Sequence, residues 1–262
     1  MRNLFSALLT ALIMITAVST SGYSQDERRQ YYQLKTYTLA NEKQDSLMDA
    51  YLKDAYLPAL KRAGIENVGV FKLRPSSYLT ANKIFVLIPF DSLKQFENLD
   101  AMLLQDKTYV SKGMPYIKAK YDDPPYERIR STLMRAFAEM PQMQPSQVEG
   151  PRKERVYELR SYESPTEATY LNKVAMFNKG GEIDLFDALG ANAVFYAEVL
   201  SGDRMPNLMY MTTYPNMETR DAIWKAFFAS DKWNELSNDP YYQNNMNKVD
   251  QLLLYPTEYS DY

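Results

Sequence analysis

The first regular pattern along the chain is an apolar stripe that predicts a helix. Apolar side chains recur at spacings of three and four residues, which places them on one face of an α-helix. These residues are Leu47, Met48, Tyr51, Leu52, Ala55, Ala59, Leu60 and Ala63. We expect the helix to end at Gly64 and to kink near Pro58, because proline cannot donate the backbone hydrogen bond of a helix interior.

Segments rich in aromatic and β-branched residues surround this helix and predict strands. The strands are expected at 31–39, 68–73, 84–89 and 129–137. A second helix, capped by Asp91, should lie between the last two of them. Residues 134–140 could equally continue as a helix. The expected order of the first half is therefore βαββαβ.

The second half repeats the first. A shift of 125 positions places residues 32–37 on 157–162, and the same shift places Asp106-Lys107 on Asp231-Lys232. Agreement near both ends of one offset indicates a tandem duplication.

The same kinds of element are expected in the second half. The sequence Ser164-Pro165-Thr166-Glu167 has the pattern of a capping box, so a helix should begin there, and Gly180-Gly181 should interrupt it. Strands are expected at 157–162, 193–200, 208–214 and 249–254, with a helix capped by Asn216 before the last strand.

A proline-containing segment separates the two repeats. Residues 139–155 contain Pro141, Pro145 and Pro151 and continue neither pattern. We therefore predict a first domain at 30–138, a linker at 139–155 and a second domain at 156–259.

Two βαββαβ units predict an α+β fold of ferredoxin-like type. Each unit should form a four-stranded antiparallel sheet with both helices on one face, which leaves the other face uncovered. We expect the two units to pack sheet to sheet as an α/β barrel with helices outside. A small ligand would then bind between the sheets, or between a sheet and its helices.

Several of these segments resemble the NIPSNAP family of the dimeric α/β-barrel superfamily. The resemblance lies in residues 157–162, in the helix end 57–64 and in residues 223–227 leading to 230–233. It covers about residues 31–259 as two tandem copies and implies the barrel fold, while the activity of the family is poorly defined. The first copy departs from the pattern, because Gln33, Lys35 and Tyr109 stand where the second copy has Glu158, Arg160 and Trp233.

The N-terminus has the pattern of a secretory signal peptide. Arg2 precedes an apolar stretch at 4–18, and small and polar residues follow. We predict a signal peptide at 1–24, with cleavage after Ser24 or after Gly22. The apolar stretch is short for a membrane span, although an uncleaved anchor is the alternative. The mature protein should then be exported, either periplasmic or secreted, with no attachment to the membrane.

Composition removes several classes of function. The 262 residues include no His and no Cys, so an imidazole base, a thiolate nucleophile and His- or Cys-ligated metals are excluded. The formal net charge of −3 gives no basic excess for binding nucleic acid. We expect no metal and no cofactor.

Aromatic residues provide the candidate binding site. The chain has 22 Tyr, 11 Phe and 2 Trp, and some of them lie on elements that could face one cavity. With a neighbouring arginine, the predicted ligand-binding set is Tyr37, Arg160, Tyr162, Tyr196, Tyr210, Trp224 and Trp233. The alternative is ordinary packing of these rings in a core. Arg160 or Lys35 could hold an anion, but we favour a salt bridge with Glu158.

Two functional hypotheses follow. The preferred one is a non-enzymatic barrel that binds a small apolar or aromatic ligand or a protein partner, and that can form a homodimer. The alternative is a cofactor-independent oxygenase or isomerase, by analogy with the wider superfamily. Its base would have to be Asp, Glu, Lys or Tyr. A carboxylate buried beside a tyrosine inside the barrel would favour the enzyme.

Overall fold

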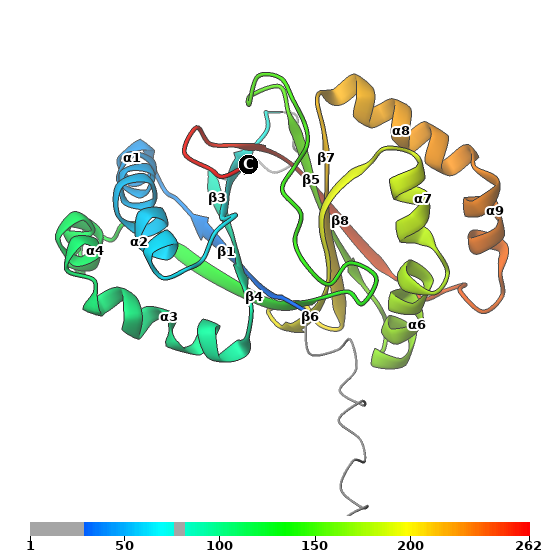
Figure 1. Cartoon of the computed structure of the whole chain (residues 1–262), viewed down its shortest axis with the longest axis horizontal. Coiled ribbons are helices and arrows are strands. Elements are labelled where there is room, and N and C mark those ends of the chain that lie inside the picture. The colour runs from blue at the N-terminus through cyan, green and yellow to red at the C-terminus, as the bar shows by residue number, and fades with distance from the viewer. Residues whose placement is uncertain (1–28, 76–81) are drawn as a thin grey trace, which may run out of the picture.

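The strands of both halves form one closed antiparallel barrel (Figure 1). The computed structural model describes residues 29–75 and 82–262, so the predicted signal peptide at 1–24 lies outside the described residues. Around the barrel the strand order is β1-β3-β2-β8-β5-β7-β6-β4. The strands are β1 (Tyr31–Thr38), β2 (Gly69–Leu73), β3 (Lys83–Phe90), β4 (Arg128–Ala136), β5 (Val156–Glu163), β6 (Asn192–Ser201), β7 (Asn207–Tyr214) and β8 (Lys248–Pro256).

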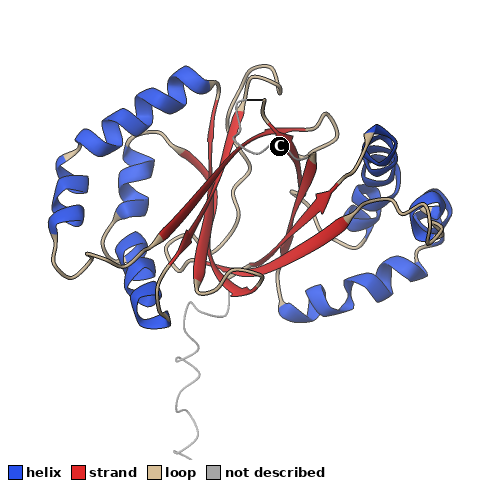
Figure 2. Ribbon diagram, turned by 180° about the vertical axis from the view of Figure 1, so that it is seen from behind, coloured by secondary structure: helices blue, strands red, loops and turns tan. Residues whose placement is uncertain are grey.

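Helices cover the barrel on two opposite sides (Figure 2). One side carries α1 (Glu42–Tyr51), the π-helical turn η2 (Leu52–Tyr56), α2 (Leu57–Arg62), α3 (Leu93–Gln105), α4 (Lys107–Lys112) and α5 (Met114–Ile117). The other side carries α6 (Glu167–Asn178), α7 (Glu182–Ala188), α8 (Met217–Ala229) and α9 (Asp231–Asn238). Among the described residues, no helix combines the length and the apolar character needed to cross a bilayer.

The predicted fold class is confirmed, and the structure adds how the two sheets join. Each unit has the βαββαβ order, and both units belong to the same chain. The sheets meet at their edges, where Phe71–Leu73 of β2 pair with Leu254–Pro256 of β8 and Leu133–Ala136 of β4 pair with Ala197–Ser201 of β6. Their inner faces therefore line one common interior.

The barrel has internal twofold pseudosymmetry. A half turn around the ring of strands carries β1, β3, β2 and β4 onto β5, β7, β6 and β8. Lys35 of β1 lies opposite Val86 and Ser131, and Arg160 of β5 lies opposite Tyr210 and Gln251. Equivalent residues of the two units therefore occupy opposite walls of the barrel.

Strand alternation divides the apolar residues into three cores. On β5, Tyr157 and Leu159 point into the barrel, and Tyr162 points toward the helices of its own unit. The barrel interior forms one core, and a separate core lies between each sheet and its helices. The molecule thus consists of helices, a sheet, an interior core, a second sheet and a second set of helices.

Several local predictions need correction at the ends of helices. Ser92, one residue after Asp91, caps α3 by accepting a hydrogen bond from the Gln95 amide. Thr166 caps α6 and forms its capping box with Thr169, while the Ser164 hydroxyl donates to the backbone of Asn245. In both cases a hydroxyl side chain closer to the first helical turn satisfies the free amide groups.

The other local predictions are resolved as follows. Asn216 caps α8 as expected. The helix containing Pro58 departs from α-helical geometry at the π-helical turn η2, immediately before the proline-containing α2. The chain from 134 continues as strand β4 to Ala136, so the helical alternative for this segment is wrong.

A buried carboxylate organises the helix side of the second unit. Glu158 on β5 is fully buried and accepts hydrogen bonds from Arg220 Nε and Nη2 at 2.8 and 2.9 Å and from Trp224 Nε1 at 2.8 Å. Arg160 lies 3.2 Å away in a further ion pair, which confirms the expected salt bridge. Three side chains from α8 and β5 therefore converge on one carboxylate and connect this helix to the sheet.

We predict that Glu158→Gln destabilises the protein by about 3 to 5 kcal/mol, because it leaves the largely buried Arg160 guanidinium without its counter-charge and leaves Arg220 with only the exposed Asp221. The control is Asp221→Asn, which removes an exposed partner of Arg220 and should cost less than about 0.5 kcal/mol. Urea unfolding monitored by tryptophan fluorescence measures both free energies. Equal stabilities of the two variants would contradict this role for Glu158.

Candidate ligand-binding site

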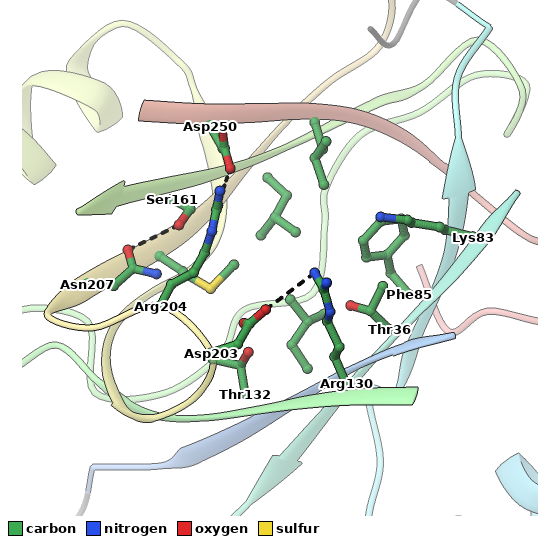
Figure 3. Close-up of a pocket in the computed structure, with 14 residues that line it drawn as sticks. Thr36, Lys83, Phe85, Arg130, Thr132, Ser161, Asp203, Arg204, Asn207 and Asp250 are labelled. Atoms are coloured by element: carbon green, nitrogen blue, oxygen red, sulfur yellow. Dashed lines mark hydrogen bonds and ion pairs between the residues drawn. The ribbon is translucent and has the colours of Figure 1, made fainter. Parts of the chain in front are cut away.

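A cavity of about 380 Å³ opens at one end of the barrel, where β1 and β5 finish (Figure 3). Both units contribute to its wall. The lining residues are Leu34, Thr36, Lys83, Phe85, Arg130, Thr132, Leu159, Ser161, Asp203, Arg204, Asn207, Met209, Asp250 and Leu252. The registers make Leu34 equivalent to Leu159 and Thr36 equivalent to Ser161, so the cavity lies on the pseudo-twofold axis.

The inner part of the cavity is apolar. Its wall is made by inward-facing side chains of five strands: Leu34, Phe85, Leu159, Met209 and Leu252. They have this position because every second residue of a strand faces the interior. Leucine, methionine and phenylalanine provide a surface that suits an apolar or aromatic molecule.

Polar groups form a ring nearer the mouth. The hydroxyl group of Ser161 donates to the Asn207 side chain at 3.1 Å, and Thr36 of β1 and Thr132 of β4 lie on the opposite wall. These groups can accept or donate hydrogen bonds to a polar substituent of a ligand. The cavity therefore changes from polar at its mouth to apolar at its depth.

The hairpin between β6 and β7 is connected by ion pairs to both units at the mouth. Asp203 pairs with Arg130 of β4 at 3.3 Å, and Arg204 pairs with Asp250 of β8 (Figure 3). Lys83 forms no ion pair with any residue in the described ranges. The lining thus has three cations and two carboxylates, which favours an anionic group at the mouth.

The opposite end of the barrel is closed. Tyr262 packs there against Phe71 and Tyr157, with ring centroids 5.8 and 6.2 Å apart. The linker also lies at this end, where the Met143 amide donates to Gln30 and the Gln144 amide donates to Val194 (Figure 1). Access from solvent is therefore through the cavity mouth.

Tyrosine hydroxyl groups are buried below the cavity. The rings of Tyr32, Tyr157 and Tyr262 belong to the interior core, and their hydroxyl groups have no hydrogen-bond partner among the described residues. Burial raises the pKa of Tyr32 and of Tyr262 above the usual value, so both phenols stay protonated. They provide hydrogen-bond donors at the depth of the barrel and no negative charge.

The predicted aromatic set lies outside the barrel interior. Arg160, Tyr162, Tyr196, Tyr210, Trp224 and Trp233 gather between the second sheet and its helices. Tyr37 lies in the corresponding core of the first unit. Tyr37 and Tyr162 are equivalent residues that face away from the barrel on opposite walls. The expectation that the whole set could face one cavity is therefore corrected, and its role in binding a ligand stays a prediction.

Contacts connect five of the six residues of the second unit, and the sixth, Trp233, packs against Phe227 with ring centroids 4.9 Å apart. The hydroxyl groups of Tyr162 and Tyr210 are 2.7 Å apart, and the Arg160 guanidinium lies 4.2 Å from the centre of the Trp224 ring. Burial is the main cause that raises the pKa of Tyr162 to about 12. Packed rings, a hydroxyl pair and a cation–π contact are the features of an aromatic core, although the Tyr196 hydroxyl group and Arg160 Nε have no hydrogen-bond partner among the described residues.

The cavity residues were not singled out from the sequence. The missing information was which face of each strand points inward, because β5 has large or charged residues on both faces. A usable signal was the repeat itself: Leu34 and Thr36 recur as Leu159 and Ser161 in the aligned segments. Among the described residues there is no group of three acidic, His or Cys side chains that could hold a metal ion.

Solved structures with the same fold include enzymes by their descriptions. A "putative monooxygenase" from Fusobacterium nucleatum aligns with a TM-score of 0.55 at 7% identity, covering 87% of this chain and 92% of that one. A protein of the same description from Lactobacillus acidophilus aligns with a TM-score of 0.55 at 10% identity, covering 87% and 94%. An anthrone oxidase-like protein aligns with a TM-score of 0.53 at 11% identity, covering 89% and 93%. At these identities the similarity establishes the fold alone.

Comparison of the sequence itself identifies a domain. No curated protein matches the chain significantly. The family model named NIPSNAP matches residues 157–261, which span the second unit from β5 to beyond β8. The second half of this barrel is therefore a NIPSNAP domain, as the resemblance of residues 157–162 and 223–233 predicted.

Proposed function

We propose that the protein is an exported barrel that binds a small apolar or aromatic molecule carrying an acidic group. The observation that supports this proposal is the cavity on the pseudo-twofold axis, with its apolar depth and its excess of cations at the mouth. Its volume of about 380 Å³ is in the range of small-molecule sites. The export part of the proposal depends on the predicted signal peptide.

The layers of the cavity suggest the orientation of the ligand. Leu34, Leu159 and Leu252 would contact the apolar body, and burial of such a surface would drive binding. The acidic group would stay at the mouth near Lys83, where part of its hydration is retained (Figure 3). Because Arg130 and Arg204 already pair with carboxylates, Lys83 is the cation that would select the acidic ligand.

A cofactor-independent oxygenase is the second candidate. The descriptions of two structural neighbours as "putative monooxygenase" favour it. Such a reaction needs a base. Among the described residues, the two buried glutamates, Glu158 and Glu182, lie on the helix side of the second sheet, where each forms an ion pair. The carboxylates of Asp203 and Asp250 at the mouth are also engaged in ion pairs. These observations favour binding over catalysis.

Filling the cavity should weaken binding. We predict that 2-naphthoate binds the wild-type protein and that Thr36→Trp weakens this binding at least tenfold, because the indole occupies the ligand's space. Isothermal titration calorimetry measures the affinity, and circular dichroism checks the fold. The matched control is Ile129→Trp, which adds the same ring on the exposed outer face of β4 and should bind as the wild type does. Equal binding by both variants would place the ligand elsewhere.

Charge selectivity should depend on Lys83. We predict that Lys83→Met weakens binding of 2-naphthoate about five- to tenfold, which corresponds to about 1 to 1.4 kcal/mol for the lost charge contact. Binding of the uncharged 2-naphthamide should be unchanged. Lys94→Met removes an exposed lysine of α3 outside the cavity and should alter neither affinity. An equal loss of affinity for 2-naphthoate and for 2-naphthamide in Lys83→Met would contradict the proposed contact.

A further inference from the structure

The first unit contains a lysine whose amine lacks a carboxylate partner. Lys35 lies on the outer, helix-facing side of β1, where Nζ is 3.0 Å from the hydroxyl oxygen of Tyr56 and 5.1 Å from the centre of its ring. Within residues 29–75 and 82–262, no acidic side chain is close enough to form an ion pair with it. The nearest recorded partner is therefore a neutral phenol.

The cation at the equivalent position of the second unit has a carboxylate partner. Arg160 occupies that position, and the buried Glu158 two residues earlier supplies the counter-charge at 3.2 Å. In the first unit that carboxylate is replaced by Gln33, whose amide donates instead to the Ser131 hydroxyl at 2.8 Å. At this position the second unit therefore has the permanently charged guanidinium group of Arg160, whereas the first unit has the amine of Lys35 without an ion-pair partner.

The side chains facing Lys35 do not replace the negative charge that Glu158 supplies in the second unit. Tyr56 comes from η2, Tyr109 from α4, Tyr126 from the segment before β4, and the exposed Asp100 from α3. Burial lowers the pKa of Lys35, and the opposing effects of Asp100, Tyr109 and Tyr126 do not offset it. Burial also raises the pKa of Tyr56, so its hydroxyl group stays protonated. It can therefore donate a hydrogen bond to a neutral amine.

The sheet surface beside Lys35 is partly open to solvent. Lys35 is partly exposed, and it pairs in register with Ser131 of β4, which is exposed. Ile129, two residues earlier on the same face of β4, is 36% exposed. The helices of the first unit therefore leave this part of the outer sheet surface open beside Lys35.

We propose that Lys35 is a reactive amine that is modified by small aldehydes through imine formation. The neutral nitrogen attacks the carbonyl carbon, the carbonyl oxygen takes up a proton, and the resulting carbinolamine loses water to give the imine. One C=N bond replaces the C=O bond, and no oxidant or reductant is needed. This site is separate from the cavity at the barrel mouth.

Competitive reductive methylation with formaldehyde and cyanoborohydride tests this proposal. Peptide mass spectrometry follows the labelling of every lysine from about pH 6 to about pH 11.5, a range that includes the ordinary lysine pKa of about 10.4, with the exposed Lys94 of α3 as the internal reference. We expect the midpoint of the pH profile of Lys35 to lie below that of Lys94. Absence of labelling at Lys35, or a midpoint equal to that of Lys94, would overturn the proposal.

Restoring the counter-charge gives a sharper comparison. Gln33→Glu recreates the arrangement of the second unit, so it should move the Lys35 midpoint upward and leave the Lys94 midpoint unchanged. Asp100→Asn removes the acidic group of α3 that favours the charged amine, and it should move the midpoint downward. Circular dichroism confirms the fold of both variants. No change of the Lys35 midpoint in folded Gln33→Glu and Asp100→Asn would contradict the proposed control by charge.

Discussion

The whole structure depends on the burial of the inner faces of two sheets. Each sheet carries helices on one side, and its other face has large apolar residues such as Tyr32 and Phe85 in the first unit and Tyr157 and Phe195 in the second. Burial of one such side chain contributes about 1.5 to 3 kcal/mol, whereas a hydrogen bond at the seams contributes about 0.5 to 1.5 kcal/mol net. The seams between β2 and β8 and between β4 and β6 are short. Interior burial therefore dominates closure, and the seams set the register.

Closure also explains where the cavity lies. Linker and C-terminal residues fill one end of the barrel, and short polar side chains such as Thr36 and Ser161 leave space at the other end. Because equivalent residues face each other across the axis, the cavity combines two similar walls. The symmetry is broken at the mouth, where Arg130 stands opposite Asp250 and the β6–β7 hairpin contributes Asp203 and Arg204. The two units therefore differ at the mouth, where charged side chains surround the entrance to an apolar interior.

The sequence was informative about the fold because its signals were local and repeated. Apolar periodicity predicted the helix around Leu52, and the offset between Tyr32 and Tyr157 predicted two like units. The sequence was less informative about the site, because the orientation of each strand depends on tertiary contacts. Glu158 and Arg160 lie on the buried helix side, although alternation alone allowed either face. Helix caps shifted by one or two residues for a similar reason, since several neighbouring polar side chains compete to cap one helix end.

The measurement that tests the shared interior most directly is equilibrium unfolding of the full chain with one probe in each unit. Both tryptophans, Trp224 and Trp233, belong to the second unit, and the absence of cysteine allows a single fluorophore to be attached to Lys94→Cys in the first. If the two sheets bury one interior, the two fluorescence signals will change at the same urea concentration with the same slope. Two separate transitions would show that the units fold independently and would contradict the account.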